Sequence, residues 1–341
     1  MRDILSVDED VIDLMDSVFT DHQETRTPSD PVTFDANLWD QLAELGLVRL
    51  TGPEDRGGGG AGWPEATALT SAAVRHGVRL PLPEHDLLAG NLVDELGFDD
   101  DAGVRTICLL DDRGRARHVP WAATADRIVV VWQVGEEHHA ADVPVTALRI
   151  DPGFNAIGEP RDTVVADLDA LDGVVVPNDL VDSLRLKSAM VRAIQTCAAL
   201  DRALDLSVLH ATTRIQFGRP LAAHQAVQGL IADIAGECAL ARAATEAALL
   251  AAVTTDWSAP GLELRVAVAR SCVGHAASIV VRNAHQVHGA IGTTREHSLH
   301  ECTRAALAWR SEFGSVHYWD QQVTHASAAD GGSGLWELIA R

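Results

Sequence analysis

Lysine is nearly absent from this sequence of 341 residues, because Lys187 is the only one and every other Lys or Arg position holds an arginine. Together with abundant alanine, valine, glycine and aspartate, this bias is typical of GC-rich genomes and indicates an actinobacterial source. Basic residues are also scarce: 27 lysines and arginines stand against 49 aspartates and glutamates, so the formal net charge is −22. Such a surface repels polyanions. We therefore expect no nucleic-acid partner and no membrane partner.

Paired cysteines are missing as well. The five cysteines are scattered without a CxxC spacing: Cys108, Cys197, Cys238, Cys272 and Cys302. An odd number without a signal peptide predicts reduced thiols. The first residues, Met1 to Ser6, contain no apolar signal-peptide core, and no run of about eighteen apolar residues is present that could span a membrane. The sequence therefore predicts a cytoplasmic protein.

Metal and phosphate-loop patterns are absent too. The 15 histidines include the pair His138-His139, and His297 lies near His300, but no HExxH or Cys-His pattern is formed. The run Gly57 to Gly60 follows no predicted strand and precedes no Lys-Ser pair, so it predicts an ordinary loop. The sequence itself therefore predicts no metal site.

The apolar residues repeat with three different patterns along the chain. Residues 1–98 show helical spacing, with Asp8 as an expected N-cap before the first helix and further helices expected at 37–45, 66–76 and 85–96. Residues 99–178 contain short β-branched runs separated by turns, which predict a small antiparallel β domain. The expected strands are 104–110, 127–133, 145–150 and 174–177.

Residues 179–341 return to long helical patterns. Helices are expected at 184–213, 221–254 and 262–288, with shorter pieces continuing to Leu338. The expected buried face of the second is formed by Val227, Leu230, Ile231, Ile234, Cys238 and Ala241. The fold class is therefore mainly α with a small β domain.

Two short stretches in this helical region carry most of the functional information. The first reads Arg-Ile-Gln-Phe-Gly at 214–218, with His-Gln at 224–225, and the second reads Gln-Val-His-Gly-Ala-Ile-Gly at 286–292. Leu-Trp-Asp-Gln-Leu-Ala-Glu-Leu-Gly-Leu at 38–47 and Pro-Glu-Asp-Arg-Gly-Gly at 53–58 precede them. In this order, the motifs resemble those of the acyl-CoA dehydrogenase family over nearly the whole chain.

The resemblance implies an N-terminal helical domain at 1–98, a reduced middle antiparallel β domain at 99–178 and a C-terminal long four-helix bundle at 179–341. It also implies FAD, because in this family the two C-terminal motifs reach the adenosine and pyrophosphate half of a neighbouring subunit's flavin. An arginine can bind a phosphate bidentately, an aromatic ring can face the adenine, and glycines permit close backbone approach. The implied cofactor-binding residues are Arg214, Phe217, Gly218, His224, Gln225, Gln286, Gly289 and Ser315.

The glutamate that removes the α-proton of the acyl-CoA in this family has no counterpart here. Its two known positions align, without gaps, with Phe313, which precedes Gly314, and with Ser188. Glu312 is adjacent in sequence, and an adjacent side chain generally points elsewhere. Ala189 stands where many members have an arginine near CoA. A missing general base costs about 10²–10⁴-fold in rate.

The middle region departs from the family as well. It lacks the Thr-Glu-Pro and Trp-Ile-Thr stretches that hold the isoalloxazine ring in relatives, and Arg185 or Arg192 could replace the CoA arginine only if the register slips. The resemblance therefore implies a non-catalytic subunit that lends its motifs to the FAD of a paralogous catalytic partner, as in the smaller subunit of actinobacterial heteromeric steroid-CoA dehydrogenases. The expected assembly is α2β2. The partner would bind most of the acyl-CoA, a steroid or sterol side-chain thioester, and an electron-transfer flavoprotein would accept the electrons.

Three alternatives stay open at this stage. The first is a self-sufficient homomeric dehydrogenase in which Glu312 is a displaced base. The second is a relative that oxygenates or oxidises other substrates, although it would still need an isoalloxazine site. The third is a flavin-free scaffold or regulatory subunit of the same fold.

Overall fold

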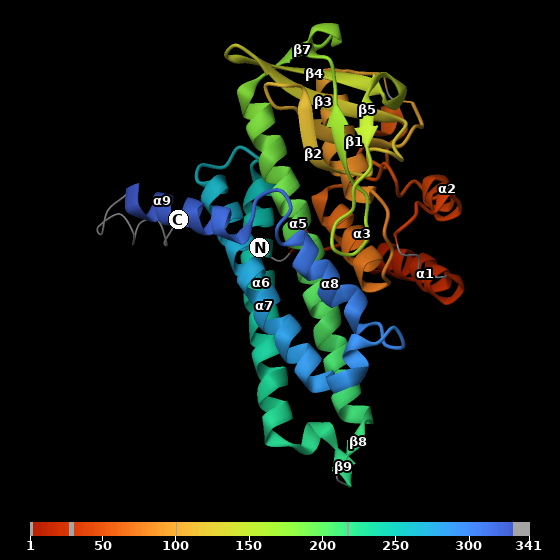
Figure 1. The fold of residues 1–341 in the computed structure, drawn as a ribbon, viewed down its shortest axis with the longest axis vertical. Coiled ribbons are helices and arrows are strands. Elements are labelled where there is room, and N and C mark those ends of the chain that lie inside the picture. The colour runs from red at the N-terminus through yellow and green to blue at the C-terminus, as the bar shows by residue number, and fades with distance from the viewer. Residues whose placement is uncertain (1–2, 27–30, 100, 217, 330–341) are drawn as a thin grey trace. The chain divides into compact units, whose positions relative to one another are not determined.

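The computed structural model describes residues 3–26, 31–99, 101–216 and 218–329. The chain divides into two compact units, Met1–Lys187 and Ser188–Arg341 (Figure 1). The expected boundaries at residues 98 and 178 stay a prediction. The fold class is confirmed, since helices dominate and the strands are confined to two small sheets and a short hairpin.

The first unit begins with helices. They are η1 (Asp3–Leu5), α1 (Glu9–Thr25), α2 (Ala36–Glu44), η2 (Glu54–Arg56), α3 (Trp63–Arg75), the π-helical η3 (Glu84–Gly90) and α4 (Asn91–Leu96). The expected N-cap is confirmed, because the side chain of Asp8 accepts a hydrogen bond from the amide of Asp10. Phe19 and Leu42 are fully buried in the core that these helices share. The expected helix at 85–96 is instead a π-helical segment followed by an α-helix.

Two small sheets follow in the same unit. The strands are β1 (Arg105–Leu109), β2 (Arg115–Pro120), β3 (Arg127–Val134), β4 (Glu137–Pro144), β5 (Arg149–Asp151), β6 (Arg161–Val165) and β7 (Val174–Val176), with η4 (Val145–Ala147) and η5 (Leu168–Ala170) between them. The sheet orders are β1-β3-β4-β7 and β2-β6-β5. All pairs within these two sheets are antiparallel except β1 with β3, which is parallel. The expected strand at 145–150 is largely η4, with β5 beginning only at Arg149.

The second unit is built around long helices, as the apolar pattern predicts. They are α5 (Asn178–Thr213), whose first residues belong to the first unit, α6 (Gln225–Thr254), α7 (Leu262–His288), α8 (Leu299–Trp309) and α9 (Val316–Ala329). The shorter connecting elements are β8 (Ile215–Gln216), β9 (Arg219–Pro220), η6 (Leu221–Ala223) and η7 (Gly289–Thr293). The bounds of α7 confirm the expected helix, while the expected helical end at Leu338 lies outside the described residues.

Helix α7 is the centre of this bundle. Its fully buried residues include Val266, Ala276 and Val280, and it packs along α6. Among the described residues, the stretch Leu262–Thr293 is the one helix long and apolar enough to cross a membrane, and half of its most apolar part is buried within the protein. A core helix of a bundle has these same properties.

The expected buried face of α6 is confirmed only in its second half. Ile234, Cys238 and Ala241 are buried, whereas Val227, Leu230 and Ile231 remain partly exposed. The helix therefore begins outside the core of its own unit.

The only lysine of the sequence is buried and is the last residue of the first unit. Lys187 is 6% exposed, and its Nζ donates a hydrogen bond to Oδ1 of Asn91, 2.7 Å away.

Candidate functional site

The first motif lies at the end of α5 and forms a tight hairpin. The amide of Arg214 donates to the carbonyl of His210, 2.9 Å away, and its carbonyl accepts from the amide of Leu221, also at 2.9 Å. Strands β8 and β9 pair antiparallel between these points. Gly218 has φ +78° at the turn, a conformation that favours glycine. The side chain of Arg214 is exposed beside the hairpin. Phe217, the expected adenine-stacking residue, lies outside the described residues.

The remaining motif residues stand at the ends of two helices. His224 precedes α6, and its Nδ1 lies 3.3 Å from Nη2 of Arg219. Gln225 is the exposed first residue of α6, and Gln286 is exposed in the last turn of α7. Gly289 ends α7 with φ +63°, and its amide donates to the carbonyl of His285.

A pair of histidines brings the two motifs together. The rings of His210 and His288 are stacked with their centroids 4.5 Å apart. Arg214 lies one helical turn beyond the first, and Gln286 lies two residues before the second. Nδ1 of His288 donates to the carbonyl of Ala284, 2.8 Å away, and burial lowers the pKa of His288 to about 4. The contact therefore places the exposed arginine and the exposed glutamine at the same end of the bundle.

The loop where the family places its base is a second region of interest. Oε2 of Glu312 accepts from Nε of Arg192 at 2.7 Å, with side-chain exposures of 15% and 0%. Nη1 of this arginine also donates to Oε1 of Gln195, 2.6 Å away, and its guanidinium lies 4.9 Å from the ring centroid of Phe313. The carboxylate of Glu312 is thus bound by a buried cation, and an aromatic ring follows it.

A second buried arginine holds this loop in shape. Nη2 of Arg270, on α7, donates to the carbonyls of Arg310, Glu312 and Gly314 at 3.2, 2.7 and 3.0 Å. Burial, with the positive charge of Arg192 nearby, lowers the pKa of Arg270 to about 9. Phe313 and Gly314 have positive φ values of 50° and 105°. Two consecutive residues with positive φ are unfavourable, and the three hydrogen bonds from Arg270 hold the loop in this conformation.

Ser315 is not close to the other candidate residues within the bundle. Its hydroxyl accepts from the amide of Tyr318 at 3.2 Å and caps the start of α9. Ser315 comes directly after Gly314, whose carbonyl is bound by Arg270, so it lies near Arg270. On α7, Arg270 is sixteen residues before Gln286. At 1.5 Å per residue this separation is about 24 Å. The structure therefore separates the base loop from the paired motifs.

The remaining positions that could supply the base or the CoA arginine of the family do not do so in this structure. Ser188 and Ala189 are both buried. Arg185 is exposed and pairs with Asp182 at 2.7 Å, whereas Arg192 is turned toward Glu312.

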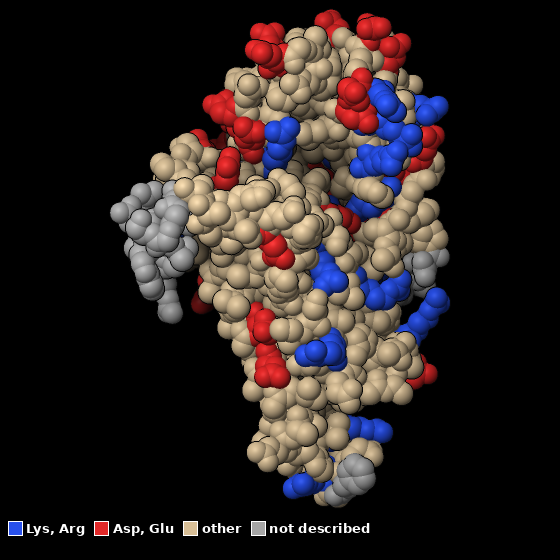
Figure 2. All heavy atoms as spheres, turned by 60° about the vertical axis from the view of Figure 1, so that its left-hand side comes forward, with Lys and Arg blue, Asp and Glu red and all other residues tan. Residues whose placement is uncertain are grey.

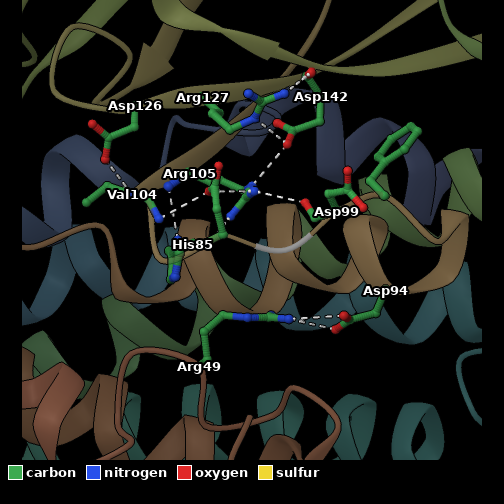
Figure 3. Close-up of polar contacts among 12 residues, drawn as sticks. Arg49, His85, Asp94, Asp99, Val104, Arg105, Asp126, Arg127 and Asp142 are labelled. Carbon is green, nitrogen blue, oxygen red and sulfur yellow. Dashed lines mark hydrogen bonds and ion pairs between the residues drawn. The ribbon is translucent and has the colours of Figure 1, made fainter. Parts of the chain in front are cut away.

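A polar network in the first unit was not anticipated from the sequence (Figure 3). Arg105 is 1% exposed, and its amide donates to Nδ1 of His85 at 3.0 Å. Its Nε donates to Oδ2 of Asp142 at 3.2 Å, the same oxygen that Nε of Arg127 reaches at 2.6 Å. Burial, with Arg49 and Arg105 nearby, lowers the pKa of His85 to about 3. These residues come from η3 and three strands, so no local motif announces the network.

The neighbouring residue of η3 is also perturbed. Asp86 is 4% exposed, and both of its oxygens accept from the amide of Thr51 at 3.2 and 3.1 Å. Burial raises the pKa of Asp86 to about 7. Arg49 lies 3.7 Å away but makes its closer ion pair with Asp94, at 2.9 Å.

The helical bundle, the small two-sheet unit and the two motifs joined at one end of the bundle can now be compared with known proteins. Residues 185–317 match the family model of the acyl-CoA dehydrogenase C-terminal domain. This is a family of oxidoreductases that generally depend on FAD.

Relatives and solved structures agree. The acyl-CoA dehydrogenase IpdE2 of Mycolicibacterium smegmatis is 27% identical over 272 residues, which are 78% of this chain and 80% of that protein. The ChsE4-ChsE5 complex from Mycobacterium tuberculosis contains a chain with a TM-score of 0.83 and 20% identity, over 95% of this chain and 98% of that one. The Tcur3481-Tcur3483 steroid ACAD matches with a TM-score of 0.83 and 21% identity, over 94% and 97%.

Proposed function

We propose that this chain is the non-catalytic subunit of a heteromeric FAD-dependent acyl-CoA dehydrogenase. In this proposal the paralogous partner supplies the general base and most of the acyl-CoA site. The present chain supplies the adenosine and pyrophosphate half of the partner's FAD site. The substrate class is a steroid or sterol side-chain CoA thioester, which is supported by similarity to the Tcur3481-Tcur3483 steroid ACAD. The complex is an α2β2 assembly in the cytoplasm, and an electron-transfer flavoprotein takes its electrons.

The observation that carries the proposal is the state of the base loop. The position that aligns with the catalytic glutamate is an aromatic residue, Phe313. The carboxylate of the preceding residue, Glu312, is ion-paired with the fully buried Arg192. A general base needs to reach the α-proton of its substrate. A carboxylate that neutralises an interior cation is committed to that cation, because exposing the buried charge is costly.

The residues at the paired motifs fit the FAD group that the family implies. Arg214, Gln225 and Gln286 are all exposed, so a guanidinium and two amides can reach an outside group. At Gly218 and Gly289 a Cβ would meet nothing within 4 Å, which leaves the backbone open to close approach. When bound, FAD supplies the hydride acceptor. The task of the residues on this chain is to bind the phosphates and orient the adenosine.

Apolar surface near these motifs supports a protein partner. Leu209 on α5 is 59% exposed and Ile215 in the hairpin is 62% exposed. On the face shown in Figure 2, the surface of the sheet-bearing part carries dense acidic and basic side chains, whereas most of the helical surface is uncharged. An uncharged surface with apolar side chains is typical of subunit interfaces.

The test is to co-express the chain with a paralogous acyl-CoA dehydrogenase from the same genome and measure FAD per purified complex. One flavin for every two chains is expected, and one flavin per chain would overturn the shared-site model. Arg214→Ala should lower FAD affinity, because a phosphate-binding cation is lost. Arg295→Ala is the control for the change in charge, since Arg295 is an exposed arginine beyond the second motif. Unchanged FAD affinity in Arg214→Ala would reject the proposed contact.

A further inference from the structure

Three histidines from separate parts of the second unit meet at one point. His210 belongs to the last turn of α5, His288 ends α7, and His297 lies in the segment before α8. The ring of His288 lies 4.5 Å from that of His210 and 4.6 Å from that of His297, measured between centroids. One nitrogen from each ring can be chosen so that all three lie within 4.8 Å of one another.

The central imidazole has the hydrogen-bond pattern of a metal ligand. Nδ1 of His288 donates to the carbonyl of Ala284 at 2.8 Å, so the proton is on Nδ1 and the lone pair is on Nε2. Metal-bound histidines are held in this way by a second acceptor. His288 is 95% buried, as its exposure is 5%. Within the described part of the chain, its Nε2 has no hydrogen-bond partner. A buried acceptor without a partner is costly, and a bound cation would satisfy it.

Burial is the main cause that lowers the pKa of His210, His288 and His297. A lowered pKa favours the unprotonated imidazole, which is the form that binds metals. The case for a metal rests on the geometry of the three rings and on the unpartnered Nε2 of His288.

We propose that His210, His288 and His297 form a binding site for a divalent transition metal, with Zn²⁺ as the reference ion. Three imidazoles with a fourth position open to water are a common zinc arrangement. His210 and His297 are partly exposed, so the cluster is in contact with solvent.

Binding requires a modest rearrangement of the rings. Nitrogens bound to one tetrahedral zinc lie roughly 3.4 Å apart, given Zn–N distances of about 2.0–2.1 Å. The present limit of 4.8 Å means that the outer rings must approach by about an ångström, and that the stacked ring of His210 must tilt. Nδ1 of His297 accepts from the amide of Leu299 at 3.1 Å. This ring therefore has either to exchange that amide for the metal or to rotate and present Nε2.

A metal at this point would link three segments that carry the paired motifs. It would join the end of α5, one turn before Arg214, to the end of α7, two residues after Gln286. It would also hold the segment from Gly289 to His297, which begins with the short 3-10 helix η7 (Gly289–Thr293). This inference concerns the residues of this chain alone and does not depend on FAD binding or on a partner.

The experiment measures metal binding by the full chain without a histidine tag, alone or in its complex, after dialysis against a chelator. Zn²⁺ affinity is measured by calorimetry, and Co²⁺ is added as a spectroscopic probe whose visible absorption becomes intense in tetrahedral sites. One equivalent is expected to bind. His210→Ala and His297→Ala should each weaken binding by more than about 10-fold, since removing even an outer-sphere partner costs about 10–100-fold.

Controls distinguish this site from scattered histidines. His300→Ala removes a neighbouring, partly exposed histidine outside the cluster, and should leave affinity unchanged. His210 is partly exposed, so its variant is expected to fold even if His288→Ala does not. Absence of a one-equivalent binding event, or equal affinity in wild type, His210→Ala and His297→Ala, overturns the proposal. So does a loss of binding that is equally large in His300→Ala.

Discussion

Replacing Glu312 by glutamine separates a structural role of this residue from a catalytic one. Its carboxylate lies 2.7 Å from Nε of Arg192, which is fully buried, while Glu312 itself is 15% exposed. Two unit charges about 4 Å apart attract by roughly 4 kcal/mol at an effective dielectric constant of about 20. Desolvation of both groups offsets part of this attraction. Glutamine keeps an oxygen acceptor but leaves the interior cation uncompensated.

We expect Glu312→Gln to lose about 2 kcal/mol of unfolding free energy. The loss stays below the roughly 3–5 kcal/mol of a fully broken buried pair, because Arg192 keeps its bond to Gln195 and its contact with the ring of Phe313. If the second unit unfolds cooperatively, the melting temperature should fall by about 4–8 °C. Turnover of the purified complex should stay within about threefold of wild type.

The assay pairs urea unfolding of the chain with steady-state turnover of the complex, and Glu246→Gln on the exposed face of α6 is the matched control. A displaced general base gives the opposite pattern. Turnover would then drop by about 10²–10⁴-fold while stability changed little. That pattern would refute the assignment of Glu312 to Arg192 and restore the self-sufficient enzyme.

Three further outcomes are expected. Arg270→Leu should cost about 3 kcal/mol or more of unfolding free energy, because three carbonyls of the base loop lose their donor; a loss below about 1 kcal/mol by urea unfolding would contradict this. The His85 contribution to stability is lost as pH falls from 6.5 toward about 3, whereas the Asp86 contribution is lost as pH rises from 3.8 toward about 7. These two pH dependences have opposite signs, so they partly cancel in the wild type. Asp86→Asn keeps only the dependence due to His85, so its unfolding free energy should fall between pH 6.5 and pH 4 by at most about 3 kcal/mol relative to the wild type. An unchanged pH profile of the urea midpoint would refute this. Gly218→Ala should cost only about 1 kcal/mol, because φ is +78° but no atom lies near the new Cβ; FAD occupancy of the complex should fall more than in a matched Gly236→Ala variant, where space is equally open, and equal occupancies would count against a flavin contact.

The long helices were predictable because their apolar residues repeat over many turns. α7 begins and ends where the pattern from Leu262 to His288 predicts. Strand β4 was missed because Gly135 to Glu137 read as a turn, and because the strand is buried only from Ala140 onward, so its first residues are polar. The parallel pairing of β1 with β3 is a tertiary choice that a strand's own composition does not specify.

The candidate site was predictable only where its residues are close in sequence. The hairpin that contains Gly218 and the helix end at Gly289 carry local signals in the sequence, namely a glycine beside polar side chains. Both glycines have a positive φ in the structure. The histidine cluster has no such signal, because His210 and His288 meet only where the C-terminal ends of α5 and α7 lie together in the folded bundle. The pairing of Arg192 with Glu312 likewise depends on a loop and a helix that are 120 residues apart.

The buried position of Lys187 limits how this protein can be marked or modified. Its ammonium is bound to Asn91 in the interior, and the chain has no other lysine. Acylating agents, amine-reactive dyes and amine cross-linkers therefore find no lysine on the folded surface. Contacts of this chain with a partner cannot be mapped through lysine cross-links, whereas its many carboxylates remain available, and enzymes that acetylate or conjugate lysine side chains have no exposed lysine along it.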